Sequence, residues 1–559
     1  MLSLGVNYAQ MHESSACIAR DGEVLYAVAE ERLSRAKHDG RFPALAIRAC
    51  LDFARVRPAD LGYICFGWST PWVSYRHELA DFVRGRQPIS YLNVLNVTRW
   101  FLSMQHQGGG QRSFTRQFGP TKARTLFVDH HRAHAISAYA YSGFDEATVL
   151  VVDGRGAWEA TSIWHGRDGR LEHVLTIPWP NSLGLFYASF TEYLGFQAYS
   201  DEWKVMGLAP YGRPGVDLRE FITLDHGAYK VAGTRLIGRG SDRIGAIEKV
   251  LGPSRTPESD IEDRYKNVAF AVQAACEEAM LGVVKMAVER TGCRKLCLAG
   301  GVGLNSKANG RILTSGLVES FFIQPAASDD GAALGAALAP YLEVGERLPV
   351  KRMRQVYLGN EYEDAEIEKV LQTYKLRSTR LSNVAATTAE LLAAGKIVGW
   401  FQGRMEFGPR ALGSRSILAD PRDPEMNAKV NNAVKFREWW RPFAPSLLAE
   451  SAGEFLESAT DSPFMILTSP VKPDKRSIIP SVTHVDGTAR PQTVEKDVSP
   501  LYWQVIKEFG ERTGVPVIMN TSFNLRGEPI VCSPTDAIRT FYTSGMDALV
   551  IGSFLVEKH

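Results

Sequence analysis

The chain has 559 residues, too many for one hydrophobic core, so we expect two or three domains. Hydrophobic residues make up 45% and charged residues 23%, which is typical of soluble enzymes and excludes general disorder and a fibrous repeat. Lys and Arg number 64 against 62 Asp and Glu; this net charge of +2 excludes a global field that attracts nucleic acid or an anionic membrane, so any anion site must be local.

The cysteines and the N-terminal residues indicate a reducing compartment. The seven cysteines are odd in number and scattered, and they lack the CxxC spacing of a zinc knuckle, so we interpret them as buried thiols. The first residues, MLSLGVNYAQ, carry no basic leader, and no stretch reaches the roughly 18 uninterrupted apolar residues of a membrane span. We therefore expect a cytoplasmic protein.

Two segments, 3–31 and 150–177, share one pattern. Each is an apolar strand, a polar turn, a second strand, then Arg-Asp-Gly and a third strand. Both Arg-Asp-Gly triplets, Arg20 to Gly22 and Arg167 to Gly169, are hairpin signals because Asp-Gly accepts positive φ. Two unrelated hairpins would give the same signal. A duplicated β-β-β-α unit instead predicts an α/β fold of the actin-like (ASKHA) or sugar-kinase-like kind, in which two related halves clamp a nucleotide.

Between these segments, VDHHRAHAISAYAYSG (128–143) is predicted to be helical and holds three of the 12 histidines. His130 and His134 are four apart, so their imidazoles project from one face and can chelate one cation. His131 lies on another face, although His131 and His134 form a less favoured alternative pair. Asp153 ends a buried strand, and Asp329 is a plausible second carboxylate. Two His and two Asp suit Fe, Mn, Zn or a similar divalent ion.

Further on, CRKLCLAGGVGLNSKANGRIL predicts a strand, a Gly turn and a helix capped by Asn305. Such a turn leaves backbone N–H groups that attract phosphate at a helix N-terminus, although tight βα turns also use Gly300 and Gly301 without a ligand. In IQPAASDDGAALGAALAPYL, Asp329 and Asp330 precede a small-residue helix, and capping of that helix is their alternative role.

The charge-rich segment GERLPVKRMRQVYLGNEYE, residues 345–363, is interpreted as a linker. Beyond it we predict a second α/β domain, with a helix (AATTAELLAAG), a strand (KIVGWF), a Gly/Arg-rich loop (QGRMEFGPRALGSRS) and a further strand (VPVIMN). The last helix is indicated by Ser533, Pro534 and Asp536, a capping arrangement with Pro at the first helical position.

Cations gather in this second domain. They are Arg404, Arg410, Arg415, Lys435, Arg437 and Arg441. Taken singly such residues are usually solvated, but the neighbouring Trp439, Trp440 and Phe443 indicate a partly buried cluster, and buried cations need anions. The strand-end residues Asn520, Thr521, Ser522 and Asn524 offer neutral donors and acceptors beside it. Together these residues predict a pocket for an acyl phosphate and a nucleotide.

These motifs resemble the NodU/CmcH family of O-carbamoyltransferases, of nodulation-factor and antibiotic biosynthesis. The matching stretches are MHESSAC, VDHHRAHAISAY, VVDGRG, DEWKVMGLAPYG, LAGGVGLNSKANG, SDDGAALGAAL, QGRMEFGPRALGSRS, KFREWWRPFAPS and MNTSFNLRGEPIVCSP. They run in order from the first strand to the last helix. The resemblance implies an N-terminal domain, 1–344, similar to the catalytic subunit of tRNA threonylcarbamoyl transfer, and a YrdC-like domain, 364–559.

The resemblance also implies the chemistry. The YrdC-like domain would form carbamoyl adenylate from carbamoyl phosphate and ATP with Mg²⁺, releasing pyrophosphate, and the N-terminal domain would pass the carbamoyl group to a hydroxyl. By the same resemblance, His130, His134, Asp153 and Asp329 would bind a divalent metal, expected to be Fe²⁺, and His131 would be a structural neighbour.

The same resemblance implies further roles. His12 would be the general base, a task that suits imidazole near pH 7; the family more usually has Asp after this residue, where this chain has Glu13. Gly300, Gly301, Asn305 and Asp330 would border the adenylate. Arg410, Lys435, Arg441, Arg490 and Ser522 match positions expected to grip carbamoyl phosphate and ATP, with Arg415, Asn520 and Asn524 beside them.

The expected partners are small molecules, namely carbamoyl phosphate, ATP and a hydroxyl-bearing acceptor. Neither nucleic acid nor a membrane is expected, and the expected assembly is a homodimer. Two alternatives stay open, namely carbamoylation of a macromolecule (tRNA or a hydrogenase-maturation target) and a nucleotide-binding and metal-binding regulator without turnover. The aromatic region from Trp68 to Gly110 either lines the acceptor pocket or packs as helical cover. The acceptor itself is not specified by the sequence.

Overall fold

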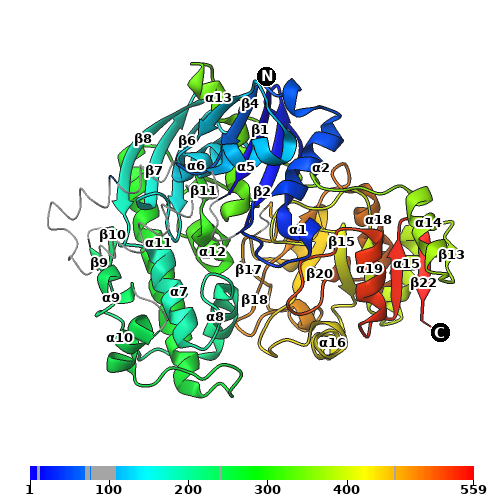
Figure 1. The fold of residues 1–559 in the computed structure, drawn as a ribbon. Coiled ribbons are helices and arrows are strands. Elements are labelled where there is room, and N and C mark those ends of the chain that lie inside the picture. Colours follow the sequence, from blue (N-terminus) through cyan, green and yellow to red (C-terminus); the bar gives the residue numbers. More distant parts are fainter. Residues whose placement is uncertain are drawn as a thin grey trace. The chain divides into compact units, whose positions relative to one another are not determined.

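The computed structural model describes residues 1–8, 13–69, 76, 109–225, 227–237, 241–458 and 461–558 (Figure 1). The chain divides into two compact units. Unit 1 consists of Met1–Glu30 and His38–Met353, and unit 2 consists of Glu31–Lys37 and Arg354–His559. The passage to unit 2 at Met353 falls inside the predicted linker.

Unit 1 contains two five-stranded sheets with the same topology. The first has the order β3-β2-β1-β4-β5, with β1 (Leu2–Asn7), β2 (Ser15–Arg20), β3 (Glu23–Ala29), β4 (Tyr63–Phe66) and β5 (Arg124–Phe127). The second has the order β8-β7-β6-β11-β12, with β6 (Glu146–Val152), β7 (Glu159–Arg167), β8 (Arg170–Pro178), β11 (Lys295–Ala299) and β12 (Ser320–Ile323). In each sheet three antiparallel strands are followed by two parallel ones. The predicted duplicated, actin-like fold is confirmed.

The two Arg-Asp-Gly turns have the predicted geometry. Asp21 and Gly22 have φ of 51° and 81°, and Asp168 and Gly169 have φ of 49° and 73°. Positive φ at both central residues is what a tight two-residue hairpin requires, because only then does the turn follow the twist of its strands. The repeated triplet therefore marks the same hairpin in both halves.

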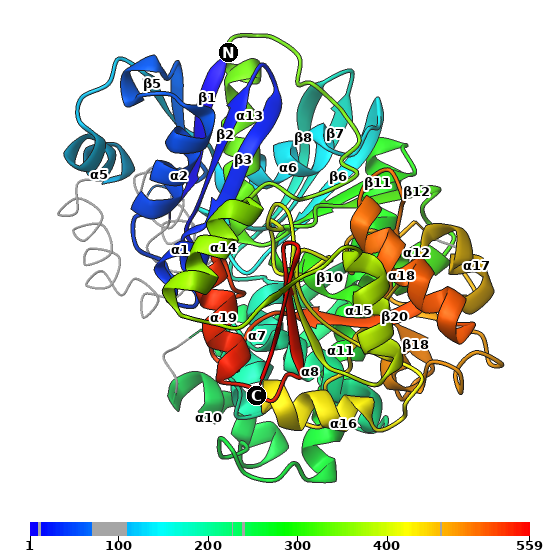
Figure 2. The ribbon, with the colours of Figure 1, turned by 90° about the vertical axis from the view of Figure 1, so that its right-hand side faces the viewer.

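Two helices fill the space between the sheets of unit 1 (Figures 1 and 2). Helix α13 (Ala332–Glu343) packs on β1, β2 and β4, and α6 (His130–Ala140) packs on β6, β7 and β11 and against α13. Glycine permits this close approach: a Cβ at Gly335 would lie 1.8 Å from the carbonyl oxygen of Ala133, and one at Gly5 would lie 2.0 Å from that of Ala333. The histidine-bearing helix is thus held in the middle of the unit.

The remaining helices of unit 1 pack on the sheets or on one another. They are α1 (Glu30–Ser34, which passes into unit 2), α2 (Ala44–Ala54), α5 (Gly109–Phe118), α7 (Leu183–Tyr193), α8 (Glu202–Leu208), α9 (Gly233–Leu236), α10 (Ser241–Leu251), α11 (Asp263–Thr291) and α12 (Ser306–Thr314), with the small hairpin β9 (Ile222–Asp225) and β10 (Ala228–Val231). In the described part of the chain, α11 alone is long and apolar enough to span a membrane. Half of its apolar window is buried inside the protein, and buried core helices pass the same test.

Unit 2 is built on an eight-stranded sheet covered on both faces. Its order is β13-β22-β21-β14-β15-β20-β16-β19, with β13 (Thr379–Arg380), β14 (Val398–Phe401), β15 (Arg415–Ala419), β16 (Ala444–Leu448), β19 (Gln492–Val494), β20 (Val517–Ser522), β21 (Ala548–Ile551) and β22 (Phe554–Glu557). The predicted strands KIVGWF and VPVIMN are β14 and β20. Along β15, Ile417 and Ala419 join one core while Leu418 joins the other, as the two-residue period of a strand requires.

The helices of unit 2 are α14 (Asp364–Thr373), α15 (Val384–Ala393), α16 (Met426–Val430), α17 (Ala452–Phe455), α18 (Pro500–Thr513) and α19 (Pro534–Tyr542), and a small sheet pairs β17 (Ser469–Pro470) with β18 (Thr488–Ala489). The predicted helix AATTAELLAAG is α15. Helix α19 begins as predicted, with Pro534 in its first turn and a reciprocal capping box between Ser533 and Asp536. Such helix starts can be predicted from the sequence because capping side chains satisfy backbone groups that a helix end leaves unpaired.

The division along the chain is less simple than one cut near residue 345, because Glu31–Lys37 belongs to unit 2. Buried Arg32 donates from Nη2 to the carbonyl of Gly408 (2.9 Å). Arg35 donates to the carbonyls of Ile530 (2.6 Å) and Pro529 (2.8 Å). Two guanidinium groups thus fix this seven-residue segment in unit 2, which hydrophobic patterning does not predict.

Candidate metal centre and anion site

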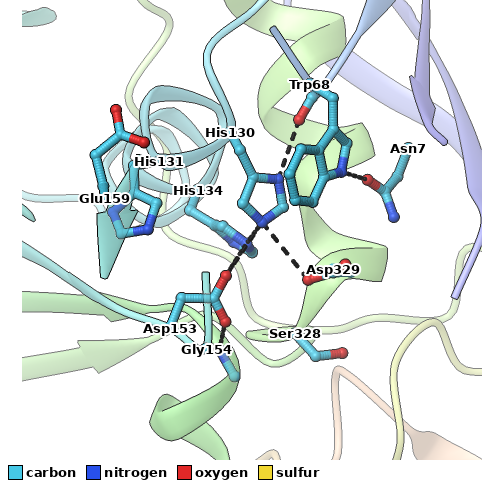
Figure 3. A network of polar contacts seen from close by, with 12 residues as sticks. Asn7, Trp68, His130, His131, His134, Asp153, Gly154, Glu159, Ser328 and Asp329 are labelled. Atoms are coloured by element: carbon cyan, nitrogen blue, oxygen red, sulfur yellow. Dashed lines mark hydrogen bonds and ion pairs between the residues drawn. The ribbon is translucent and has the colours of Figure 1, made fainter. Parts of the chain in front are cut away.

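Four side chains from three places in the fold of unit 1 converge on one point (Figure 3). His130 and His134 project from the first two turns of α6, whose N-cap Asp129 accepts a hydrogen bond from the N–H of Arg132 (3.2 Å). Asp153 directly follows β6, and Asp329 lies at the start of the short 3-10 turn Asp329–Gly331 before α13. Because α6 and α13 pack against each other, the helix starts and the strand end meet.

The geometry of this cluster is that of a cation site. One ligand atom from each of the four residues lies within 4.8 Å of all the others. His130 Nε2 is 3.1 Å from Asp153 Oδ2, 3.5 Å from Asp329 Oδ1 and 3.1 Å from His134 Nε2. His130 and His134 are fully buried, and the side chain of Asp329 keeps 22% of its surface exposed. One side of the cluster is therefore open to a ligand.

Neighbouring groups fix the orientation of the ligands. His130 Nδ1 lies 3.1 Å from the carbonyl oxygen of Gly67, which can only accept, so Nδ1 carries a proton. In the neutral ring Nε2 then keeps its lone pair, which faces the two carboxylates, as in ring-oriented metal histidines. Trp68 stacks on His130 with ring centroids 3.9 Å apart, and its Nε1 donates to Asn7 Oδ1 (3.0 Å).

Electrostatics within the cluster call for a positive charge. Burial disfavours a charged His130, but the hydrogen bonds and negative charges of Asp153 and Asp329 outweigh it and raise the pKa of His130 well above its usual value. Burial and the nearby His130 lower the pKa of His134 well below normal. The negative charge of the two carboxylates can be balanced either by a proton on His130 or by a divalent ion. Mixed N/O donors of this kind suit Fe, Mn or Zn, so the residues fit the predicted metal.

His131 does not join this cluster. Its Nδ1 lies 2.8 Å from Ser162 Oγ, and burial lowers its pKa to about 4, so it stays neutral inside the fold. A Cβ at Gly156 would lie 2.6 Å from its ring, which shows how closely the loop after β6 packs on it. This geometry agrees with the structural role expected of His131, and it disfavours the alternative His131–His134 pair.

The residues predicted to border a nucleotide lie beside the metal cluster, but several have structural tasks. Gly300 has φ of 91°, and a Cβ there would lie 2.3 Å from the carbonyl oxygen of Val152. The N–H of Gly301 donates to Asp153 Oδ1 (3.0 Å), so it holds a cluster residue and is not available to a phosphate. Asn305 caps α12 as predicted, accepting from the N–H of Ala308 (3.1 Å). Asp330 is buried, and Ser15 Oγ donates to its carbonyl (2.9 Å).

Two predictions fall outside the described residues. His12, the predicted base, lies in the stretch 9–12, and most of the aromatic region expected near the acceptor lies between residues 70 and 108. At the edge of that region, Trp68 is described, and it supports His130.

In unit 2, five basic side chains gather as predicted in outline. Arg410, Lys435, Arg441 and Arg490 were expected there, and Arg437 joins them. Burial, followed by the charges of Arg410 and Arg441, lowers the pKa of Arg490 well below normal, and burial alone lowers that of Arg410 to about 10. Guanidinium groups still keep their protons at neutral pH, so the cluster retains its charge. An acid also belongs to this group: Glu438 lies 3.4 Å from Arg441.

Several donors of this cation cluster are buried without a hydrogen-bond partner among the described residues. They are Nε of Arg410, Nε of Arg490 and Nη2 of Arg437. Buried donors in native proteins are nearly always paired, and an unpaired one often marks a ligand site. Because these donors belong to cations, an anion with several oxygens, such as a phosphate, would satisfy them.

Lys435 lies at the end of a π-helical turn, Asn431–Lys435, which turns its side chain inward. Its Nζ donates to Ser522 and Asn524: the carbonyl and Oδ1 of Asn524 are both 3.0 Å away, and Ser522 Oγ is 3.3 Å away. Burial, then the charges of Arg437 and Arg441, lower the pKa of Lys435 well below its usual value. Ser522 and Asn524, which were both predicted to bind substrate, therefore accept hydrogen bonds from Lys435 and hold its side chain in position.

Two further predicted binding residues, Arg415 and Asn520, make structural hydrogen bonds, although each also keeps one buried polar atom without a partner among the described residues. Arg415 is fully buried, with Nη1 donating to the carbonyl of Gln402 (2.8 Å) and Nη2 to that of Asn360 (3.0 Å), and it stacks on Phe401 at 3.7 Å. Asn520 is buried and donates to Ser446 Oγ (3.0 Å). We leave both out of the phosphate set. The loop sequence could not separate Arg415 from Arg410, because both follow glycine-rich turns.

Arg437 was predicted as a member of the cation cluster, but the family resemblance gave it no role in the site. Its guanidinium lies 4.1 Å from the Phe443 ring and donates from Nε to Asn431 Oδ1 (2.9 Å). Its position two residues after Lys435 in KFREWW was the available signal, since the turn at Phe436, with φ of 45°, brings both inward. The sequence also gave no sign of the contacts of His38, whose Nδ1 lies 3.3 Å from Glu13 Oε1 and whose Nε2 lies 2.8 Å from Ser200 Oγ.

Comparison with known proteins covers both units. A family model described as carbamoyltransferase N-terminus matches residues 3–338, and one described as carbamoyltransferase C-terminus matches residues 389–558. Nodulation protein NolNO of Sinorhizobium fredii is 40% identical, over 100% of this chain and 80% of that protein. Nodulation protein NolO of Bradyrhizobium diazoefficiens is 43% identical, over 77% of this chain and 79% of its own. Nodulation protein U of Rhizobium fredii is 36% identical, over 42% of this chain and 39% of that protein.

Proposed function

This chain belongs to the carbamoyltransferase family and is a carbamoyltransferase, and from that premise we propose that it works through carbamoyl adenylate and carbamoylates a hydroxyl of a small molecule. The observation that carries the proposal is the presence of two separate sites: a cation cluster with orphaned donors in unit 2 and a histidine–carboxylate cluster in unit 1. One site suits the activation of phosphorylated substrates, and the other suits transfer of the activated group.

We propose that adenylation takes place at the cation cluster. Water cleaves the P–O bond of carbamoyl phosphate to give carbamate and phosphate, and a carbamate oxygen then attacks the α-phosphorus of ATP, so that pyrophosphate leaves. Each step gathers negative charge, which Arg410, Lys435, Arg437, Arg441 and Arg490 would neutralise as preorganised donors. Mg²⁺ is expected to enter with ATP.

Transfer would then take place in unit 1. His130, His134, Asp153 and Asp329 would hold a divalent ion, proposed to be Fe²⁺, which would supply positive charge for the adenylate phosphate. Gly300, Asn305 and Asp330 would border the adenylate, and Gly301 would act indirectly by orienting Asp153. His12 would take the proton of the acceptor hydroxyl as its oxygen attacks the carbamoyl carbon and AMP leaves.

The test of this function uses purified full-length protein, ATP, Mg²⁺ and carbamoyl phosphate without an acceptor. We expect pyrophosphate release that depends on carbamoyl phosphate, and mass spectrometry should detect carbamoyl adenylate. Pyrophosphate release equal with and without carbamoyl phosphate would contradict adenylate formation. We propose that the partners are small molecules, with a sugar or natural-product alcohol as acceptor, in a cytoplasmic homodimer.

The two half-reactions should separate by mutation of the base. His12→Asn should leave pyrophosphate release unchanged and lower transfer by about 10²- to 10⁴-fold, the usual contribution of a general base. The measurement is AMP release against pyrophosphate release from the same reaction. If both products fell together, His12 would act in adenylation or in folding, and its proposed role would be wrong.

A further inference from the structure

One buried carboxylate closes the turn that carries Arg410 in unit 2. Glu406 is 3% exposed and lies in the loop between β14 and β15. Its Oε1 accepts hydrogen bonds from the backbone N–H groups of Leu412 (2.7 Å), Ser414 (2.7 Å) and Arg415 (3.2 Å). Hydrogen bonds to a carboxylate are stronger than those between neutral groups. Arg410 therefore lies in a turn whose two ends are joined through one carboxylate oxygen.

The same turn is held from the protein core at Leu412, two residues after Arg410. The carbonyl of Leu412 accepts hydrogen bonds from the hydroxyl of Tyr357 (2.9 Å) and from Nε2 of Gln492 (2.8 Å). Gln492 is buried on β19 and stands two residues after Arg490 in the sequence. The two chain segments that carry these guanidinium groups are thus joined through the backbone of Leu412.

The cations that this frame brings together repel each other. Burial, followed by the charge of Arg410, lowers the pKa of Arg490 well below its usual value. The Nε of each guanidinium group is buried and has no hydrogen-bond partner among the described residues. Buried like charges cost free energy in the folded protein, so a rigid frame is needed to keep both donors in place until an anion binds.

We infer that Glu406 is a positioning residue of the anion site, whose carboxylate fixes Arg410 relative to Arg490 so that both guanidinium groups bind one phosphoryl group. Glu406 acts through the backbone of the loop. A carboxylate repels a phosphate, but the three N–H groups that it binds offset its charge. This inference rests on the proposed function, since it takes the cation cluster as the phosphate site, and it adds the residue that preorganises that site.

The test measures the affinity of the full-length protein for pyrophosphate by isothermal titration calorimetry. Arg410→Met should weaken binding by about 10- to 100-fold, as expected for the loss of a charge-assisted hydrogen bond. Glu406→Met should weaken it by a similar factor, because the loop no longer holds the guanidinium in place. Glu406→Gln keeps an oxygen that can accept from the same N–H groups, so it should bind within about 3-fold of wild type.

A double-mutant cycle separates positioning from a general loss of structure. If Glu406 acts through Arg410, Glu406→Met should have no further effect on pyrophosphate affinity when Arg410 is already Met. The control is Glu511→Met on α18, where Glu511 pairs with Lys507 at 3.0 Å. This variant should bind pyrophosphate as wild type does.

A milder variant tests the same frame if Glu406→Met does not fold. Tyr357→Phe removes a single hydroxyl that donates to the carbonyl of Leu412. It should weaken pyrophosphate binding by about 3-fold, the effect of one neutral hydrogen bond, and this effect should vanish in the Arg410→Met background.

Three results would overturn the inference. They are a wild type that does not bind pyrophosphate, a Glu406→Met variant that binds it as wild type does, and losses that add in full when Glu406→Met and Arg410→Met are combined. Full additivity would indicate that Glu406 supports the fold and not the guanidinium. If the expected pattern of binding is found but wild type releases no pyrophosphate from ATP and carbamoyl phosphate, the proposed adenylation alone is contradicted, so the two failures are distinguishable.

Discussion

Lys435→Met should lower carbamoyl-phosphate-dependent pyrophosphate release by at least about 100-fold. The variant should still fold. The ammonium of Lys435 lies near Arg437 and Arg441 and, among the described residues, donates to neutral oxygens of Ser522 and Asn524. A phosphate that enters the cluster would meet this charge at close range. Methionine keeps the length of the side chain and removes the charge, so the loss would report electrostatics and not packing.

The same substitution should not lower stability, because burial of the Lys435 ammonium near other cations costs free energy in the folded protein. The pKa of Lys435 is lowered in the folded protein, whereas the unfolded chain has the ordinary value of about 10.4. Between these two values the unfolded state binds more protons, so the free energy of unfolding of wild type should rise with pH there. Lys435→Met should lose part of that rise and should have an equal or higher melting temperature at pH 7.

The matched control is Lys507→Met, on the exposed face of α18, where Lys507 pairs with Glu511 at 3.0 Å. Exposed pairs contribute little, so neither activity nor stability should change. Added pyrophosphate should raise the melting temperature of wild type and of this control but not of Lys435→Met. Pyrophosphate release by Lys435→Met near the wild-type rate would remove Lys435 from the proposed site.

The parts of the fold that could be predicted are those fixed by local physics. Asp-Gly needs positive φ, so Arg20 to Gly22 and Arg167 to Gly169 indicated two equivalent hairpins, and the sheets around them do have one topology. Ser533 and Asp536 close a capping box because helix ends leave backbone groups unsatisfied. By contrast, Glu31–Lys37 lies in unit 2 through long-range bonds of Arg32 and Arg35, and such bonds leave no periodic signal.

The residues of the two candidate sites were also predicted unevenly, because residues on one element reveal their contacts by spacing, whereas long-range contacts do not. His130 and His134 share a helix face, so their pairing follows from spacing, and Asp153 follows from a polar residue at the end of a buried strand. Arg410 and Arg415 look alike in the sequence, and both keep a buried Nε without a hydrogen-bond partner among the described residues, but Arg415 also donates from Nη1 and Nη2 to backbone carbonyls. His38 was missed because its partners, Glu13 and Ser200, are 25 and 162 residues away.

The second large effect is expected at the cluster of His130, His134, Asp153 and Asp329. Wild-type protein should bind one divalent ion per chain, measured as metal content after dialysis against Fe²⁺, Mn²⁺ or Zn²⁺. Asp153→Asn should lower the affinity by more than about 100-fold and should abolish transfer while pyrophosphate release persists. His131→Gln is the control, because His131 faces Ser162 and not the cluster. It should bind metal as wild type does.

This experiment decides between two explanations of the same geometry. Without a metal, a proton on His130 would balance the carboxylates, and the hydrogen bond and charge of His130 would keep the pKa of Asp153 below its usual range despite burial. Asp153→Asn would then lower stability at pH 7, since a lowered carboxyl pKa stabilises the fold above about pH 3.9 and loses that effect as the pH falls. A metal centre predicts more: the ion raises the melting temperature of wild type, acid releases it because the imidazoles must be neutral to bind it, and Asp153→Asn shows neither effect. Equal melting temperatures with and without each ion would leave a buried ion-pair network as the explanation.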